Sequence, residues 1–272
     1  MTDHDVMPEG IDPGVPSVAR MYNHYLGGKD NFAADRAAAE EFMRVLPGIR
    51  EMAWANRAFL SRAVTLLAHQ GVHQFLDVGS GLPTRENVHE VAHRVAPQAR
   101  VVYVDIDPIV LAHGRALLQD TPLTSVVRAD VREPEALLAH PEIGDVLDLT
   151  RPVAVLLASV LHFVPDEALV TRLMSVLRGR LVPGSHVVLS HAFEGDVDDE
   201  TREAGQRPYR LTGAGGLTSR GPERLAELMD GLEMLEPGVV PVQAWRPERH
   251  GDEEEVPVDL TLPAILAVVG RR

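Results

Sequence analysis

The spacing of hydrophobic residues changes character near residue 72. Before that point, apolar residues recur every three or four positions, which is typical of amphipathic helices. The segments with this pattern cover residues 17–26, 33–46 and 50–70. Gly71 ends the last of them, as glycine does after many helices, and Ser17 is a candidate cap for the first. We therefore predict an N-terminal helical arm over residues 17–71, preceded by a flexible, proline-containing lead-in over residues 1–16.

After residue 72, short apolar runs rich in β-branched residues alternate with amphipathic runs. The expected strands cover residues 73–78, 100–105, 123–128, 152–158 and 185–191. The expected helices cover residues 86–96, 108–119, 133–139 and 166–178. This alternation predicts a parallel sheet that is covered by helices on both faces.

The last quarter of the chain has a different pattern. Residues 195–221 are first acidic and then glycine-rich, and we expect a long loop or lid-like insertion there. Pro222 is placed to start a helix that ends near residue 230. Two extended runs, 232–245 and 258–270, then predict an antiparallel hairpin.

An acidic connector over residues 248–257 joins these two runs and is expected to be a solvated loop. The whole pattern predicts an α/β fold with a Rossmann-like, seven-stranded, mostly parallel sheet that ends in this hairpin. We expect the sheet and its helices to form one domain over residues 72–272, with the arm as a helical cover on it.

Composition and charge narrow the range of partners. The chain has 272 residues and a formal net charge of −14, so we expect neither nucleic acid nor an anionic membrane as a partner, because phosphates would be repelled. It contains no cysteine, which excludes disulfides and thiolate metal sites. The 12 histidines lack ligand spacing, so no metal is expected. No leader and no membrane-length apolar run is recognised, and the expected location is the cytoplasm.

The most informative stretch is the end of the first expected strand. An apolar run containing Asp77 leads into Gly79, Ser80 and Gly81. Glycines at such a turn let backbone N–H groups approach a ligand that a side chain would keep away. Because ligands of open α/β sheets bind at the carboxyl ends of the strands, the turn predicts a nucleotide-like cofactor. Thr84 stands where a dinucleotide fingerprint has its third glycine, which counts against a nicotinamide cofactor.

Acidic residues end the next two expected strands. Asp105 can accept hydrogen bonds from a ribose diol, whereas Asp107, which precedes a proline, fits a helix cap. Asp130 can accept from an exocyclic adenine amine while the Val131 N–H donates to a ring nitrogen. The alternative for Asp130 is an ordinary turn or capping aspartate. Three successive strands that each end in an acid or a glycine turn favour the ligand interpretation.

These motifs, in this order, resemble those of class I S-adenosylmethionine-dependent methyltransferases. The matching segments are Asp77-x-Gly79-x-Gly81, Val104-Asp105-Ile106 and Ala129-Asp130-Val131. The expected terminal hairpin is similar to that of the same class. The stretch over residues 22–32 and Trp245-Arg246-Pro247 further resemble an actinobacterial family of such methyltransferases, whose substrates are largely unassigned.

The resemblance implies a role for each matching residue. The backbone at Gly79 and Gly81 would approach the methionine part of S-adenosyl-L-methionine. Asp105 would hold the ribose hydroxyls, and Ile106 would pack on the adenine. Asp130 and Val131 would contact the adenine edge. Asp77 would orient the glycine turn or meet the cofactor's amino group through water.

The segment after the fourth strand, residues 158–165, is the best candidate for chemistry. Ser159 is expected to contact the cofactor. His162 is either a base near neutral pH or a packed histidine beneath the site. Arg57, in the long helix of the arm, either meets the cofactor carboxylate or pairs with a surface acid.

The acceptor side of the site is expected to come from the arm and the insertion. Tyr22, Tyr25 and Asn31 surround a Gly-Gly break, which suits a lid that closes over a ligand. The alternative is a surface turn whose tyrosines anchor the arm. Tyr209, in the insertion, is a candidate contact to the acceptor.

The sequence therefore predicts methyl transfer from S-adenosyl-L-methionine to a small-molecule acceptor, with S-adenosyl-L-homocysteine as the product. A cofactor-binding sensor or partner protein without catalysis is the first alternative. A nicotinamide-dependent oxidoreductase is the second, and both the incomplete glycine series and the terminal hairpin count against it.

Overall fold

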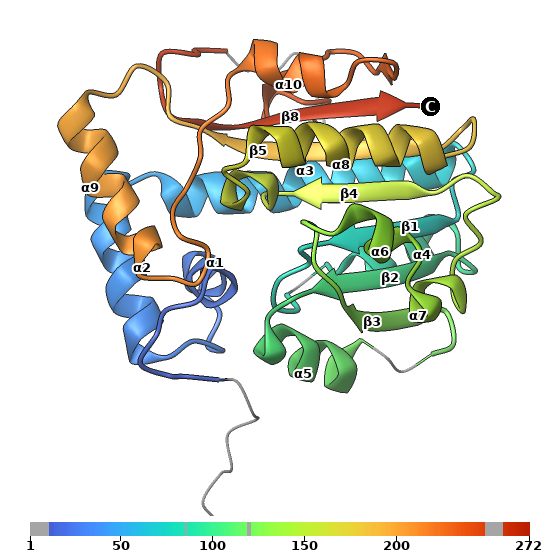
Figure 1. Cartoon of the computed structure of the whole chain (residues 1–272), viewed down its shortest axis with the longest axis horizontal. Helices are drawn as coiled ribbons and strands as arrows, with labels where there is room; N and C mark the ends of the chain where they lie inside the picture. The colour runs from blue at the N-terminus through green and yellow to red at the C-terminus, as the bar shows by residue number, and fades with distance from the viewer. Residues whose placement is uncertain (1–10, 85, 119–120, 248–257) are drawn as a thin grey trace, which may run out of the picture.

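The protein is built around one sheet with helices on both faces and a group of helices beyond one end of the strands (Figure 1). The computed structural model describes residues 11–84, 86–118, 121–247 and 258–272. The helices are α1 Val18–Tyr25, α2 Ala33–Val45, α3 Ile49–His69, α4 Val88–Val95, α5 Pro108–Leu117, α6 Pro134–Leu138, α7 Pro141–Gly144, the 3₁₀ turn η1 Leu161–Phe163, α8 Glu167–Arg180, α9 Asp199–Arg210 and α10 Pro222–Leu228. The strands are β1 Gln74–Val78, β2 Arg100–Asp105, β3 Thr124–Arg128, β4 Ala154–Ala158, β5 His186–Phe193, β6 Glu233–Met234, β7 Val240–Pro241 and β8 Ala264–Arg271.

The strand order places the site. It runs β3-β2-β1-β4-β5-β8-β6, with β7 also paired to β8. Strands β1 to β5 are parallel, and β8 is antiparallel to β5. The chain moves outward from β1 to β3 and then returns to pair β4 beside β1, so the order reverses between β1 and β4. Such a switch point leaves a crevice at the carboxyl ends of the two strands.

Alternation along the strands divides the core into two layers. Phe75 faces a cluster that includes Phe59 and Leu67 of α3, whereas the next residue, Leu76, faces a cluster that includes Leu173 and Leu177 of α8. Because successive strand side chains point to opposite faces, the apolar run of β1 can be buried on both sides. The predicted two-sided parallel sheet is confirmed.

The arm and α9 form the group of helices beyond the carboxyl ends of the strands (Figure 1). Helices α1 and α2 pack on each other, and α9 packs on α2. A small core joins them, with Met21 and Tyr25 from α1, Phe42 from α2 and Tyr209 from α9. We call α1, α2 and α9 the cap.

Two segments differ from the sequence-based expectations. The insertion over residues 195–221 contains helix α9 instead of being a loop throughout. Its N-cap is Asp198, whose side chain accepts from the Thr201 N–H at 2.7 Å. The extended run over residues 232–245 is interrupted by Pro237 and Gly238 and gives two short strands. The sheet therefore has eight strands in the described residues instead of the seven expected.

The predicted lead-in is described only in part, and the predicted acidic connector is not described. Of the lead-in, residues 11–16 contain a turn, and Ile11 packs beside Leu82 and Ile109. Residues 1–10 and the acidic connector over residues 248–257 lie outside the described residues.

Candidate functional site

The glycine turn after β1 lies at the switch point, at the carboxyl end of the strand. Gly79 and Gly81 have φ angles of 73° and 67°, which favour glycine. A Cβ atom on Gly79 would lie 2.4 Å from a methyl group of Val160, so no larger residue fits there. A Cβ on Gly81 would have no neighbour within 4 Å, which shows that this side of the turn faces open space. The turn is therefore shaped for close approach of a ligand to the backbone.

Asp105 holds this turn in place. Its carboxylate accepts hydrogen bonds from the N–H groups of Gly81 at 2.9 Å, Ile106 at 2.8 Å and Asp107 at 3.0 Å. Burial raises the pKa of Asp105, and these backbone hydrogen bonds oppose the rise. A carboxylate has about four lone-pair directions. Asp105 can therefore still accept a hydrogen bond from a ligand, although fewer than the two that were expected from a ribose diol.

The predicted capping role of Asp107 is confirmed. One of its oxygens accepts from the Ile109 N–H at 2.8 Å, at the start of α5. The other accepts from the Ser17 hydroxyl at 2.5 Å. Ser17 occupies the N-cap position of α1, but its hydroxyl makes this bond instead of a capping bond. The pair ties the start of the arm to the loop after β2.

The adenine-side candidates line the same cavity. The Ile106 side chain is 47% exposed, which leaves an apolar surface open. The Asp130 carboxylate accepts a hydrogen bond from the Arg132 N–H at 2.9 Å, which closes a local turn. It also forms an ion pair with the Arg132 guanidinium at 2.6 Å. Partial burial tends to raise the pKa of Asp130, but the hydrogen bonds from Arg132 lower it below its ordinary value. A ligand that bonds to Asp130 must share it with Arg132 or displace that side chain.

Asp77 is a buried carboxylate beneath the turn. Its side chain lines the cavity, and the residue is 3% exposed. Burial raises its pKa to about 7; the Arg57 charge lowers it and the Asp105 charge raises it further. Arg57 also lines the cavity and donates to the Glu86 carbonyl at 3.0 Å, a backbone oxygen and not a surface carboxylate.

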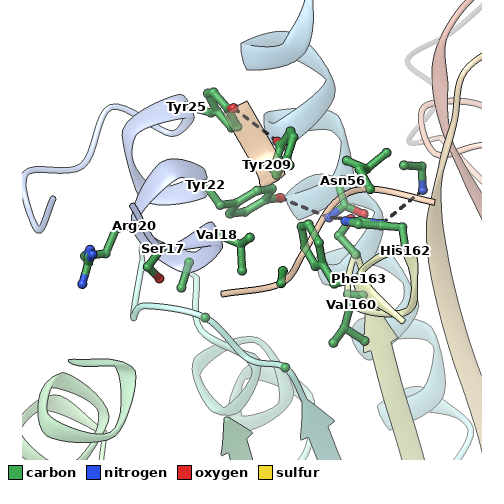
Figure 2. A pocket seen from close by; sticks show the side chains of 18 of the residues that line it. Ser17, Val18, Arg20, Tyr22, Tyr25, Asn56, Val160, His162, Phe163 and Tyr209 are labelled. Carbon is green, nitrogen blue, oxygen red and sulfur yellow. Dashed lines mark hydrogen bonds between the residues drawn. The ribbon is translucent and has the colours of Figure 1, made fainter. Parts of the chain in front are cut away.

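The end of β4 is joined to the arm through Asn56 (Figure 2). The Asn56 Nδ2 donates to the Ser159 Oγ at 3.1 Å and to the Tyr22 hydroxyl at 3.0 Å. Ser159 has a φ of 55°, a conformation that is uncommon for serine and is associated with functional sites. Its N–H donates to the Ser190 carbonyl at 3.0 Å. The predicted cofactor contact Ser159 and the predicted lid residue Tyr22 are thus brought together.

His162 also lines the cavity, and its contacts define its protonation. The residue is 6% exposed, and its Nδ1 accepts from the Ala192 N–H at 3.3 Å. The neutral ring therefore carries its hydrogen on Nε2. Burial lowers the pKa of His162 well below its ordinary value, and the neighbouring charges of His191 and Arg220 lower it further. Of the two interpretations of His162, these contacts favour the packed histidine.

The three candidate tyrosines lie together, and Phe163, which the sequence analysis did not single out, joins them. Tyr22, Tyr25, Phe163 and Tyr209 all line the cavity and come from α1, η1 and α9 (Figure 2). Asn31 does not line it. Its Nδ2 donates to the Asn23 Oδ1 at 2.9 Å and to the Gly28 carbonyl at 3.0 Å, which holds the turn between α1 and α2.

These groups share one cavity of about 670 Å³. One end is formed by the glycine turn and the ends of β2 and β3, and the other by the aromatic side chains of the cap. This volume is within the usual range for small-molecule and cofactor sites. The open glycine turn, the exposed Ile106 and the residual capacity of Asp105 fit the cofactor that the motifs imply.

The described residues contain neither a candidate metal site nor a candidate membrane-spanning helix. Within residues 11–84, 86–118, 121–247 and 258–272, no three His, Cys, Asp or Glu side chains are grouped so that they could hold a metal. In those same ranges, no helix combines the length and apolar character that crossing a membrane requires.

Sequence reasoning did not assign a role to Asn56. The signal was present, because Asn56 is a polar residue four positions from both Met52 and Leu60 on a helical face that is otherwise apolar. Such a residue needs a buried partner or a ligand. Its partner Ser159 is 103 residues away in the chain, which the helical pattern alone could not reveal.

The reversal of strand order, the glycine turn beside it and the antiparallel β8 define the class I S-adenosylmethionine-dependent methyltransferase fold. The chain belongs to a family described as S-adenosyl methyltransferase, whose profile matches residues 4–270. The protein is thus an S-adenosylmethionine-dependent methyltransferase, and the predicted cofactor and class are confirmed.

Two crystal structures are similar to the whole chain. One is a protein from Thermobifida fusca YX that is provisionally assigned as a methyltransferase, with 42% identity over 99% of both chains and a TM-score of 0.87. The other is a DUF574 family protein from Streptomyces avermitilis MA-4680, with 37% identity over 96% of this chain and 99% of that chain and a TM-score of 0.83. No curated protein matches the chain.

Proposed function

We propose that this methyltransferase acts on a small molecule that binds at the aromatic end of the cavity. The single observation that carries the proposal is the continuity of the cavity, which joins the three strand-end motifs to the aromatic side chains of the cap. A macromolecular acceptor would need an open surface beside the cofactor. Here the cap helices α1, α2 and α9 lie over the carboxyl ends of the strands (Figure 1).

The cofactor half of the cavity has a defined set of candidate contacts. The turn at Gly79 and Gly81 would receive the methionine part, with Asp77 beneath it. Asp105 would accept from the ribose, and Ile106 would cover one adenine face. Val131 and Asp130 would meet the adenine edge, the latter in competition with Arg132. When bound, the cofactor supplies a methyl group that is already activated as a sulfonium substituent.

The protein's main contribution is then to align the acceptor and to exclude water. Tyr22 and Tyr25 of α1 and Tyr209 of α9 wall the acceptor end. Ser159 at the end of β4 lies where the two halves of the cavity meet, since it bonds to Asn56, which bonds to Tyr22. The two interpretations of His162, a base or a packed histidine, both stay predictions, as do the cytoplasmic location and the exclusion of nucleic acid and membrane partners.

Calorimetric titration of the full chain with S-adenosyl-L-methionine and S-adenosyl-L-homocysteine tests the cofactor site. We expect both to bind, and Asp105→Ala to weaken binding by about 1.5–3 kcal/mol, the usual range for a hydrogen bond to a charged group. Asp230→Ala is the matched control, because it removes an exposed carboxylate just after the end of α10 and should leave cofactor binding unchanged.

Radiolabelled methyl transfer to a pool of small molecules, and separately to protein and RNA, tests the acceptor. Turnover confined to small molecules supports the proposal. Cofactor binding with methyl transfer only to protein or RNA would refute it. Equal affinity of Asp105→Ala and the wild type for the cofactor would remove the assigned role of Asp105 alone.

A further inference from the structure

The orientation of the Asn56 side-chain amide is fixed by its neighbours. The Tyr22 hydroxyl has one hydrogen, and it donates this hydrogen to the Ala53 carbonyl at 3.1 Å, because a carbonyl can only accept. The Tyr22 oxygen must therefore accept from Asn56. This requires that Nδ2, and not Oδ1, faces both Tyr22 and Ser159.

Within the described part of the chain, the side-chain oxygen of Asn56 has no hydrogen-bond partner. Asn56 is 3% exposed, and among the described residues no group donates to its Oδ1. A buried acceptor without a donor keeps the full cost of its desolvation, so native proteins rarely leave one without a partner from the protein, from ordered water or from a ligand. Because Asn56 lines the cavity, the missing donor is expected on a bound molecule.

The position of Asn56 indicates which molecule this is. Nδ2 bonds both to the end of β4, on the cofactor side, and to Tyr22 of α1, on the acceptor side. Among the described residues, the predicted cofactor contacts at the ends of β1, β2 and β3 make no hydrogen bond to Asn56, and Ser159 at the end of β4 meets Nδ2 instead of Oδ1. A donor that meets Oδ1 is thus best placed on the acceptor, at the atom that faces the junction of the two halves.

The walls of the acceptor end indicate the shape of this molecule. Rings of Tyr22, Phe163 and Tyr209 line it, and the Phe163 and Tyr209 centroids are 5.8 Å apart. Among the charged residues of the lining, Arg202 pairs with Glu194 at 2.9 Å, and the Arg57 charge acts on the Tyr22 hydroxyl, where it opposes the rise in pKa caused by burial. Aromatic side chains around the site favour a planar ligand with apolar faces.

We propose that the acceptor is a planar, mostly apolar molecule of the phenol or N–H heteroarene class, and that its O–H or N–H donates to the Asn56 Oδ1. The proposal rests on the proposed function and specifies its substrate class. In the overall reaction, the acceptor oxygen or nitrogen gains the methyl group, the sulfonium becomes a neutral thioether that keeps the electron pair of the broken bond, and the acceptor's proton is released to solvent. Asn56 is a positioning contact, since a neutral amide holds the hydrogen without taking the proton.

The test uses the full chain saturated with S-adenosyl-L-homocysteine and a panel of probes measured by NMR and calorimetry. The matched probes are p-cresol and p-xylene, which differ only by a hydroxyl in place of a methyl group; indole and glycine complete the panel. We expect p-cresol to bind about tenfold or more tightly than p-xylene, as one satisfied hydrogen bond implies. Indole should bind, and glycine should not.

Variants then locate the effect. Asn56→Leu should abolish the preference for p-cresol over p-xylene and leave the affinity for S-adenosyl-L-homocysteine within about twofold of the wild type, which is below one hydrogen bond. Gln98→Leu removes an exposed amide far from the cavity and should change neither. The wild-type preference needs no variant, so the test holds even if Asn56→Leu does not fold.

Three results would overturn the inference. The first is p-xylene binding as tightly as p-cresol, and the second is glycine binding while the planar probes do not. The third is an Asn56→Leu variant that loses S-adenosyl-L-homocysteine affinity but keeps the p-cresol preference, which would place the donor on the cofactor. Failure of the wild type to bind S-adenosyl-L-homocysteine would instead contradict the proposed function, so the two failures are distinguishable.

Discussion

The hydroxyl groups of Tyr25 and Tyr209 lie 3.2 Å apart and join α1 to α9 across the top of the cavity. Burial raises the pKa of both, that of Tyr209 to about 12, so both stay protonated at neutral pH and one donates to the other. Phe42 packs edge-on against Tyr209, with ring centroids 5.0 Å apart. The two helices therefore share a buried polar contact inside an apolar setting.

We expect Tyr25→Phe and Tyr209→Phe each to lower the free energy of unfolding by about 1 kcal/mol, the usual net value of one hydrogen bond. Because both variants remove the same bond, the double variant should lose little more than either single variant. Urea denaturation of the four proteins gives the coupling energy. Fully additive losses would show that the hydroxyls do not interact in solution.

Arg220 forms a second connection, between the loop before α10 and η1. It is 3% exposed and donates to the carbonyls of Leu161 at 3.0 Å and Val164 at 2.8 Å. It also pairs with Glu167 at 2.7 Å and donates to the His191 Nε2 at 2.9 Å. Four of the five N–H groups of the guanidinium thus have partners, and two of these partners are backbone carbonyls on either side of His162.

We expect Arg220→Met to destabilise the fold by about 3–5 kcal/mol, because it leaves several buried acceptors without a donor. Arg224→Met is the matched control, since Arg224 pairs with the same Glu167 but has a 30% exposed side chain. Arg224→Met should lower the free energy of unfolding by about 1 kcal/mol or less. Comparable losses for the two variants, measured by urea denaturation, would contradict the buried role of Arg220.

The sheet could be predicted because its strands bury both faces. Val101 and Val102 of β2 are both fully buried, and a continuous apolar run of this length between turn residues indicates an interior strand. Helix α9 could not be predicted in the same way. Most of its residues are charged or polar and Pro208 lies inside it, so neither an apolar stripe nor a propensity signal was present.

The site could be predicted only where local chemistry defines it. Gly79 adopts a positive φ in a tight turn, and Asp107 caps the start of a helix. Both roles depend on the local backbone and can be recognised from the sequence. The bonds of Ser17 to Asp107 and of Asn56 to Ser159 join residues 90 and 103 positions apart. Such contacts depend on how the arm docks on the sheet, which no spacing within one segment encodes.

Asp77 should make the stability of the protein depend on pH. Its ordinary pKa of 3.8 is raised to about 7 in the fold, chiefly by burial. Between these values the folded state holds a proton that the unfolded state has released, so this group's contribution to stability falls as pH rises from about 4 to 7 and is constant above. The full effect is on the order of 4 kcal/mol.

We therefore expect Asp77→Asn to be about as stable as the wild type near pH 4 and more stable above pH 7. Buried histidines act in the opposite direction: the pKa of His191 is lowered to about 4, mainly by burial, and its contribution is lost as pH falls below 6.5. That term is common to both proteins and cancels in their difference. A difference that does not change with pH in chemical denaturation would contradict the assignment.

The two interpretations of His162 can be separated by the pH dependence of turnover. Because its Nδ1 accepts from the Ala192 N–H and its pKa is lowered well below 6.5, the ring is neutral throughout the physiological range. We expect kcat of the wild type to show no inflection from this residue between about pH 6.5 and 8. His162→Gln should then reduce kcat without changing the shape of the profile. An acidic limb near the ordinary histidine pKa that disappears in His162→Gln would instead establish His162 as the base.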